Sequence, residues 1–140
     1  MTIAAILGDK GHEVVSIGAD ASVGEAVALL AARRIGAVPV MADGAVAGVF
    51  SERDVIRCLS EGGALDAPVR DRMTAPAVTV ARDHPVLAAL SLMTQRRIRH
   101  LPVVEDGRVV GIVSIGDLVK YRIDMIEREA AAMRDYITQN

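Results

Sequence analysis

The segment VPVMADGAVAGVFSERD, residues 38–54, decides the fold, because it recurs as LPVVEDGRVVGIVSIGD at residues 101–117. Sliding the chain by 63 residues aligns residues 15–57 with residues 78–120 without a gap, and 16 of the 43 pairs are identical. Many of the other pairs exchange like for like, such as Ile17 with Val80. We therefore interpret the chain as a duplicated unit of roughly 60 residues.

Each copy predicts the same order of elements, β-α-β-β-α. A short β-rich stretch, residues 14–17 or 78–80, precedes a helix whose apolar residues recur at i, i+3, i+4 and i+7. Ser22 and Glu25 form a capping-box pattern at the start of the first helix. In the second copy we expect Pro85 in the first helical turn, where its missing N–H leaves no hydrogen bond unmade.

The two quoted segments each predict a β-hairpin, because Asp-Gly between apolar runs is the strongest short hairpin signal. The expected strands are residues 37–41 with 45–50, and residues 101–104 with 108–113. A proline cannot donate a hydrogen bond to a sheet, so Pro39 and Pro102 should start or bend their strands. A further helix is expected to follow each hairpin.

The organisation predicted from these elements is two tandem units followed by a long helix. Residues 1–60 form unit 1, residues 61–72 a linker rich in glycine and charge, residues 73–120 unit 2, and residues 121–140 a helical extension. The fold class is α/β, more narrowly α+β. One unit of this size buries too little surface to be stable by itself, which explains why two occur together.

The helical extension carries an apolar stripe spaced by 4, 3, 4, 3 and 4 residues, which is typical of heptad repeats. The stripe consists of Val119, Ile123, Ile126, Ala130, Met133 and Ile137. It lies beyond the repeat, so the second unit cannot cover all of it. Two interpretations remain open: the tail folds back over its own unit, or it pairs with a second copy or another protein.

Composition excludes several classes of protein. The chain has 140 residues, 51% hydrophobic and 2% aromatic, with a net charge of −2, so we expect neither disorder nor binding to nucleic acid or membranes. It contains no apolar run of the roughly 20 residues that a membrane span needs. A single cysteine, Cys58, and the lack of basic residues before the apolar patch at residues 3–7 favour a cytoplasmic protein.

The sequence shows no catalytic constellation, so we do not expect an enzyme. His12, His84 and His100 have no metal-ligand spacing among themselves or with Cys58. Cys58 lies on a helical pattern and is expected to be a small packed residue.

What does recur is Ser51-x-x-Asp54 and Ser114-x-x-Asp117, each at a junction between strand and helix. A serine hydroxyl and free amides at a helix start bind anions, and a carboxylate can accept hydrogen bonds from a sugar diol. A capping box alone explains the same spacing, and this alternative stays open.

The two copies differ where charge would matter for an anionic ligand. Arg99 and His100 precede the second apolar strand, whereas Gly36 and Ala37 occupy the matching positions of the first copy. Arg53 lies inside the first Ser-x-x-Asp motif, and the matching position of the second copy is Gly116. Neighbouring side chains on a strand point to opposite faces, so Arg99 and His100 should have different surroundings. A solvated surface position remains an alternative for each cation.

Two tandem units that each end in apolar-Pro-Val, Asp-Gly and Gly-x-x-Ser-x-x-Asp resemble a pair of CBS domains, and residues 96–120 are similar to small stand-alone bacterial proteins of this kind. The resemblance covers about residues 3–120. It implies two units packed through their sheets about a pseudo-twofold axis, with two clefts between them. In the family such clefts bind adenosine-containing regulatory ligands: AMP, ADP, ATP, S-adenosylmethionine and sometimes NAD(H).

The resemblance also implies which residues form each cleft, one unit supplying the adenine wall and the other the ribose and phosphate contacts. The first cleft would use Val15, Ile35 and Gly36 for the base, Asp117 for the ribose, and Ser114 and His100 near phosphate. The second would use Met73, Val78, Ile98 and Arg99 for the base, Asp54 for the ribose, and Ser51 and Arg53 near phosphate.

These assignments predict a difference between the clefts. Guanidinium groups match phosphate oxygens, so Arg53 and Arg99 can both bind phosphate, whereas His100 is cationic only below about pH 6.5. The cleft with Asp54 should therefore prefer more highly charged ligands, and Asp54→Ala should change the affinity for ATP, ADP and AMP. We do not expect equal occupancy of the two clefts, because Gly36 and Ala37 offer no cation.

The leading hypothesis is a non-enzymatic sensor that binds an adenine nucleotide, forms a homodimer and alters an unidentified protein partner. No cofactor or metal is required. The rival hypothesis from another class is a structural interaction module whose clefts are degenerate and whose helical tail tethers a partner. A nucleotide hydrolase is a third possibility, which no metal cluster or activated nucleophile supports.

Overall fold

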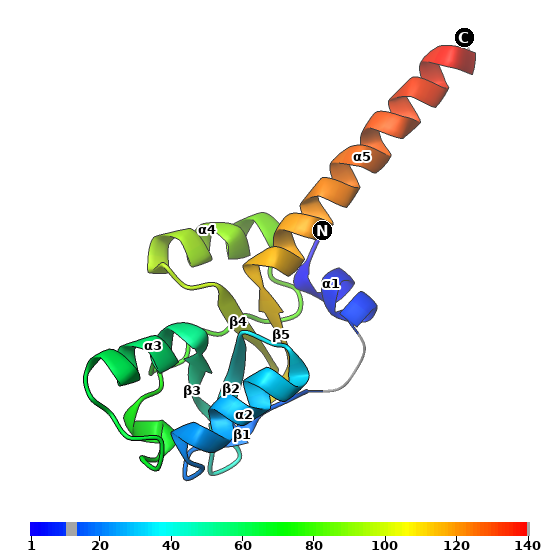
Figure 1. The fold of residues 1–140 in the computed structure, drawn as a ribbon. Helices are drawn as coiled ribbons and strands as arrows, with labels where there is room; N and C mark the ends of the chain where they lie inside the picture. The colour runs from blue at the N-terminus through cyan, green and yellow to red at the C-terminus, as the bar shows by residue number, and fades with distance from the viewer. Residues whose placement is uncertain (11–13, 140) are drawn as a thin grey trace.

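The computed structural model describes residues 1–10 and 14–139 and consists of two α/β units followed by one long helix (Figure 1). The elements are α1 (Ile3–Lys10), β1 (Ile17–Gly18), α2 (Val23–Arg33), β2 (Ala37–Ala42), β3 (Ala45–Ser51), α3 (Glu52–Ser60), the 3-10 turn η1 (Val69–Asp71), α4 (Val86–Arg96), β4 (His100–Glu105), β5 (Arg108–Ser114) and α5 (Ile115–Gln139). The predicted fold class is confirmed.

Each unit is built on one hairpin. Unit 1 has a sheet in the order β1-β2-β3, with β1 parallel to β2, and unit 2 has the antiparallel pair β4-β5. A parallel bridge between Val80 and Val103 takes the place of β1 in unit 2. The strands β3 and β5 contact each other across the boundary between the units.

The Asp-Gly turns form as predicted, with both central residues left-handed. Their φ angles are 53° and 78° at Asp43 and Gly44, and 51° and 76° at Asp106 and Gly107. Positive φ at both central positions is the geometry of a type I′ turn, which matches the twist of the flanking strands. Glycine at the second position adopts this conformation without steric cost.

Of the two outcomes expected at the prolines, a strand start or a bend, the structure shows the bend, because Pro39 and Pro102 lie inside β2 and β4. Pro102 takes part in the sheet through its carbonyl, which accepts the Val80 amide at 3.1 Å. The register of each hairpin shifts just beyond the proline, at Val40/Met41 and Val103/Val104. The strands therefore bend near the proline without ending there.

The helix starts follow the sequence with one correction. The Ser22 hydroxyl accepts the Glu25 amide at 3.0 Å and caps α2 as predicted. Pro85 lies at the N-cap position with extended backbone, one residue before the first turn in which it was expected. At the other ends, Arg34 and Arg97 adopt left-handed φ angles of 53° and 55°, a conformation more often taken by glycine.

Each hydrophobic core includes residues from outside the stretch of sequence that was predicted to form its unit. The core of unit 1 includes Phe50 and also Val69, which comes from the segment predicted as a linker. The core of unit 2 includes Ile3, Ile6 and Leu7 of α1, from the opposite end of the sequence. By packing, the first helix therefore lies with the second unit, and Figure 1 shows α1 beside the base of α5.

Equivalent segments complete the two units. In unit 1, the carbonyl of Ala67 and the amide of Val69 bond to the residues on either side of Ser22, at 2.9 and 2.7 Å. In unit 2, the carbonyl of Met1 and the amide of Ile3 bond in the same way to the residues on either side of Pro85, at 3.2 and 3.0 Å. Residues 1–3 thus correspond to residues 67–69 with an offset of 66, not 63.

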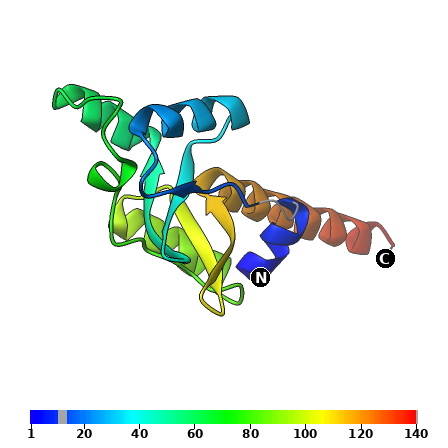
Figure 2. The ribbon, with the colours of Figure 1, turned by 90° about the horizontal axis from the view of Figure 1, so that it is seen from below.

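The helix α5 begins in the core of unit 2 and continues beyond it. Leu118 is fully buried, whereas Met133 and Ile137 are 64% and 68% exposed. At 1.5 Å per residue the helix is about 37 Å long, and Figures 1 and 2 show its distal part projecting from the body. The interpretation that the tail folds back over its own unit is therefore wrong. Within the described residues, no helix has the length and apolar character needed to cross a membrane.

Candidate functional site

In the part of the chain that the structure describes, two clefts lie at the boundary between the units, and each is lined from both units. The Asp54 cleft has a volume of about 160 Å³ and contains the start of α3. The Asp117 cleft has a volume of about 390 Å³ and contains the start of α5. In each case the opposite wall comes from the segment that precedes the first hairpin strand of the other unit.

The residues predicted for the first cleft all line the Asp117 cleft. They are Val15, Ile35, Gly36, His100, Ser114 and Asp117. The Asp54 cleft is lined by six of the seven residues predicted for the second, namely Ser51, Arg53, Asp54, Val78, Ile98 and Arg99. The remaining residue, Met73, packs against the core of unit 1 instead. This placement concerns geometry, and binding of a ligand by these residues remains a prediction.

The carboxylate of Asp54 is buried and holds four hydrogen-bond donors. Its Oδ2 accepts the Ser51 amide at 2.9 Å and the Ser51 hydroxyl at 3.2 Å. Its Oδ1 accepts the Thr74 hydroxyl at 2.8 Å and also pairs with the Arg57 guanidinium. A carboxylate offers about four lone-pair directions. Asp54, which is 2% exposed, has therefore filled its capacity within the protein.

Asp117 has a more open setting. Its Oδ2 accepts the Ser114 amide at 2.8 Å, and its own amide donates to the Ser114 hydroxyl at 3.1 Å, which is a reciprocal capping box. The capping interpretation of the Ser-x-x-Asp motif is thus confirmed for both copies by these contacts. The side chain of Asp117 is partly exposed to the Asp117 cleft, unlike the buried side chain of Asp54.

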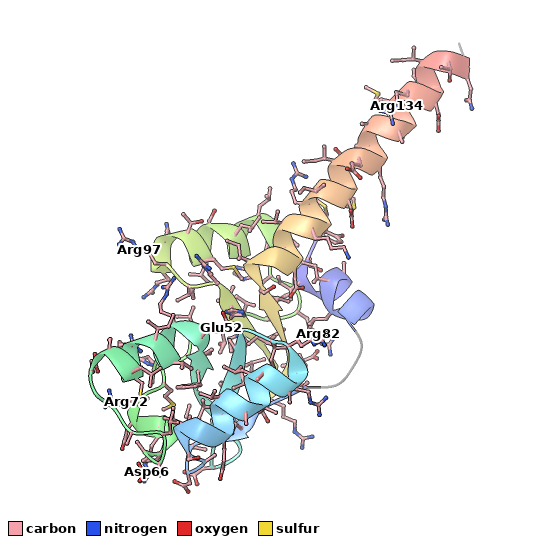
Figure 3. All side chains as sticks on the ribbon, viewed as in Figure 1. Glu52, Asp66, Arg72, Arg82, Arg97 and Arg134 are labelled. Atoms are coloured by element: carbon pink, nitrogen blue, oxygen red, sulfur yellow. The ribbon has the colours of Figure 1, made fainter. Side chains whose placement is uncertain are left out.

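Charged side chains are distributed more evenly between the clefts than the sequence indicated. The Asp54 cleft has Arg53 and Arg99, but Glu52 also lines it and adds negative charge. Figure 3 shows Glu52 at the boundary between the units. The Asp117 cleft has His100 and also Arg34, the left-handed residue at the end of α2.

Arg53 makes a bond that joins the two units. Its guanidinium donates to the carbonyl of Arg97 at 2.8 Å, across 44 residues of sequence. Arg97 ends α4, so this cation lies at the negative end of that helix dipole. A phosphate in the Asp54 cleft would compete with the Arg97 carbonyl for Arg53.

The two clefts share a wall. Gly36 and His100 line both of them. A Cβ atom on Gly36 would lie 3.3 Å from His100 Nε2, which is a tight contact, and 3.6 Å from Glu52 Oε1, which is an ordinary one, so a side chain at this position would crowd the imidazole. The absence of a side chain at Gly36 lets the imidazole reach the boundary between the clefts.

Sequence reasoning missed several residues that line the clefts, and Leu7 is one of them. Leu7 lies over Gly111 in the Asp117 cleft, where a Cβ atom on the glycine would be 2.6 Å from Leu7 Cδ2. Met73 lies over the equivalent Gly48, where a Cβ atom on the glycine would be 2.8 Å from the Met73 sulfur. Leu7 and Met73 differ by the offset of 66 that the backbone hydrogen bonds show for the flanking segments, but residues 1–8 and 67–74 share no identical pair at this offset. Like Thr74, Glu52 and Arg34, Leu7 therefore carried no signal in the sequence that could have assigned it to a cleft.

The other reactive residues have ordinary surroundings. Cys58 is 1% exposed and packs in the core of unit 1, as predicted. Among the described residues there is no group of three or more His, Cys, Asp or Glu side chains that could hold a metal ion. His84 is half-buried at a turn, and His12 lies outside the described residues.

Relatives with similar sequences are CBS-domain proteins. The mitochondrial CBS domain-containing protein CBSX3 of Arabidopsis thaliana is 36% identical over 125 residues, which cover 84% of this chain and 61% of that protein. The CBS domain-containing protein YhcV of Bacillus subtilis is 30% identical over 120 residues, covering 85% of this chain and 84% of that protein. The chain thus spans under two thirds of the plant protein and most of the bacterial one.

A solved structure shows the same architecture. The CBS domain protein PAE2072 from Pyrobaculum aerophilum, complexed with AMP, superposes with a TM-score of 0.81 at 30% sequence identity, covering 91% of this chain and 97% of that chain. The sequence model of the CBS domain matches residues 10–61 and again residues 69–124, well over half of the chain. The repeat, the paired units and these matches together establish that the chain belongs to the CBS domain family, as a tandem pair.

Proposed function

We propose that this protein is a non-enzymatic regulatory module that binds an adenosine-containing ligand between its two CBS units. The observation that carries the proposal is the Asp117 cleft, in which a partly exposed carboxylate at a helix start faces an apolar wall from the other unit. The AMP complex of the Pyrobaculum relative supports the choice of ligand class. Within the described residues, nothing resembles a metal centre that would support hydrolysis.

The Asp117 cleft is proposed as the primary site. Pockets that bury a small ligand typically measure about 300–1,000 Å³. The Asp117 cleft, at about 390 Å³, falls in this range, whereas the Asp54 cleft, at about 160 Å³, falls below it. A nucleoside would therefore enter the Asp117 cleft with less rearrangement.

Within the Asp117 cleft the lining residues divide by chemistry. Val15 and Ile35 provide aliphatic walls for an adenine ring, because the chain has few aromatic residues that could stack on it. Asp117 accepts hydrogen bonds from the ribose hydroxyls. Arg34 supplies positive charge for a phosphate, to which a His100 ring N–H and the Ser114 hydroxyl donate hydrogen bonds.

The Asp54 cleft is proposed as a weaker or conditional site. A ribose could hydrogen-bond to Asp54 only by displacing one of its present donors, such as Thr74 or Arg57. Such a displacement leaves a polar group without its partner, which costs about 1–3 kcal/mol for a buried group and less for the half-exposed Arg57. The filled carboxylate also favours the alternative function, a structural module with at least one degenerate cleft.

A ligand would act by changing how the two units sit against each other. It shifts such an equilibrium only through different affinities for the two arrangements. The bond from Arg53 to the Arg97 carbonyl spans the units beside the Asp54 cleft, so a phosphate that captures Arg53 would weaken that link. We further propose that the protein works in the cytoplasm as a homodimer whose movement alters a protein partner.

The proposal is tested by calorimetric titration of the purified protein with adenosine, AMP, ADP, ATP, NADH and S-adenosylmethionine, with GMP as the base control. Native mass spectrometry first shows whether a ligand has co-purified. We expect saturable binding of at least one adenosine compound, weakened about tenfold in Asp117→Asn and unchanged in Asp124→Asn, a matched change on the exposed side of α5. Failure of every adenosine compound to bind ligand-free protein would favour the structural module.

A further inference from the structure

The apolar stripe of α5 lies on the side of the helix that its own unit leaves open. Leu118 and Tyr121 pack in the core of unit 2, and Met125, one turn beyond Tyr121, is half-buried. The first three residues of the stripe, at the same level of the helix, are 43%, 49% and 48% exposed, namely Val119, Ile123 and Ile126. The body therefore covers one face of the helix base, and the stripe is accessible along its full length.

The stripe defines a heptad register. Its spacing assigns Ile123, Ala130 and Ile137 to position a and Val119, Ile126 and Met133 to position d. The residues Leu118, Tyr121 and Met125 then fall at positions c and f, away from the a/d seam. A second helix could approach the seam without meeting the unit from which α5 emerges.

The charges beside the stripe select the partner. Position g is occupied by Arg122, Glu129 and Tyr136, and position e by Lys120, Glu127 and Arg134. In a parallel pair of identical helices in register, each g residue faces the e residue five positions later on the partner helix. Both such pairs, Arg122 with Glu127 and Glu129 with Arg134, join opposite charges. Figure 3 shows Arg134 on the projecting part of α5.

An antiparallel pair of α5 helices that overlaps along the same stripe brings like charges together. When a layers face d layers over the whole stripe, e faces e and g faces g. Glu127 then meets Glu127 of the other helix, Glu129 meets Glu129, and Lys120 meets Arg134. All of these contacts join like charges, which destabilise a helix pair. Charge thus favours the parallel arrangement.

We propose that α5 forms a parallel, in-register two-stranded coiled coil with α5 of a second copy of this chain. This deepens the proposed homodimer by giving it a surface and an orientation, and it does not depend on nucleotide binding. The seam spans residues 119–137, fewer than three heptads, and such short helices are marginal by themselves. The association is therefore concentration-dependent, with a dissociation constant in the micromolar range.

The test needs no ligand. It measures the mass of the full chain by analytical ultracentrifugation from about 1 to 200 µM, a range that brackets a micromolar dissociation constant. The wild-type chain forms dimers. Glu127→Arg places like charges at two symmetric contacts and weakens the dimer about tenfold. The swap Arg122→Glu/Glu127→Arg restores it, because the pair becomes attractive again with reversed signs. Arg128→Glu, a charge reversal at position f, serves as the matched control and leaves the dimer intact.

Orientation is measured independently with Met133→Cys, since Cys58 is buried and does not compete. In the parallel register the two new cysteines face each other and form a disulfide in a glutathione buffer, whereas the control Arg128→Cys stays reduced. A monomer across the whole range, a trimer, or a double swap weaker than Glu127→Arg would overturn the proposal. A dimer that is insensitive to all of these changes would place self-association on another surface, with nucleotide binding still intact.

Discussion

Replacing Asp54 and Asp117 separately by asparagine should have two different effects, one mainly on stability and the other mainly on ligand affinity. The two aspartates occupy equivalent positions of the repeat, yet Asp54 is buried and holds four donors while Asp117 is partly exposed in the larger cleft. We expect Asp54→Asn to lower stability with a small effect on AMP affinity. We expect Asp117→Asn to lower AMP affinity with a small effect on stability.

The size of the stability effect follows from the contacts of Asp54. An asparagine oxygen can keep the two Ser51 donors, but its amide then faces Thr74 and Arg57. Bonds to a charged acceptor contribute about 1.5–3 kcal/mol each, and the contribution of Arg57, 48% exposed, is reduced by solvent. The net loss is about 2–3 kcal/mol. For a domain of this size that lowers the melting temperature by about 6–10 °C.

The loss for Asp117→Asn is smaller, because the asparagine oxygen can still accept the Ser114 amide. Helix caps contribute about 1 kcal/mol, so the melting temperature should fall by about 3 °C or less. Loss of one charge-assisted bond to the ribose should weaken AMP binding about tenfold. Differential scanning calorimetry and AMP titration of both variants provide the two readouts.

The reasoning is refuted if Asp54→Asn melts within about 1 °C of the wild-type protein, since its carboxylate would then not hold Thr74 and Ser51 in place. It is also refuted if AMP affinity falls for Asp54→Asn and is unchanged for Asp117→Asn. That result would make the smaller cleft the primary site.

Four further substitutions test packing and the shared wall. Gly48→Ala puts a Cβ atom 2.6 Å from the Thr74 backbone carbonyl, whereas Gly111→Ala meets the flexible end of Leu7, so chemical denaturation should show a larger loss for Gly48→Ala, by about 1–2 kcal/mol. Ile3→Ala should cost about 2–5 kcal/mol in the same assay although it lies near the chain terminus, because Ile3 is fully buried in unit 2; a loss under about 1 kcal/mol would contradict that packing. Gly36→Ala should reduce AMP affinity with a modest change in melting temperature, since its methyl group would press on His100; unchanged affinity would show that the shared wall does not shape the site.

Much of the fold could be predicted from local patterns. The repeat is visible in the sequence itself, and the Asp-Gly hairpins and the Ser22 cap depend only on neighbours within a few residues, so the structure confirms them. The strands at Pro39 and Pro102 were harder, because whether a proline interrupts a sheet depends on which of its groups the sheet uses. That information is absent from the spacing of residues.

Long-range packing explains the rest. The apolar residues of α1 predict a buried helix face, but nothing in the sequence says that Ile3 lies in the second core. The difference between the clefts has a similar origin. Asp54 accepts a hydrogen bond from the Thr74 hydroxyl, and Thr74 comes from the segment after the predicted linker. Two motifs with the same letters, Ser-x-x-Asp, therefore end in different surroundings.

A crystal structure of the protein with AMP tests the central claim most directly. The account predicts density for the nucleotide in the Asp117 cleft, with the ribose hydroxyls within hydrogen-bond distance of the Asp117 carboxylate and the adenine ring against Val15 and Ile35. Nucleotide density confined to another surface, or an empty Asp117 cleft in crystals grown with saturating AMP, would contradict it.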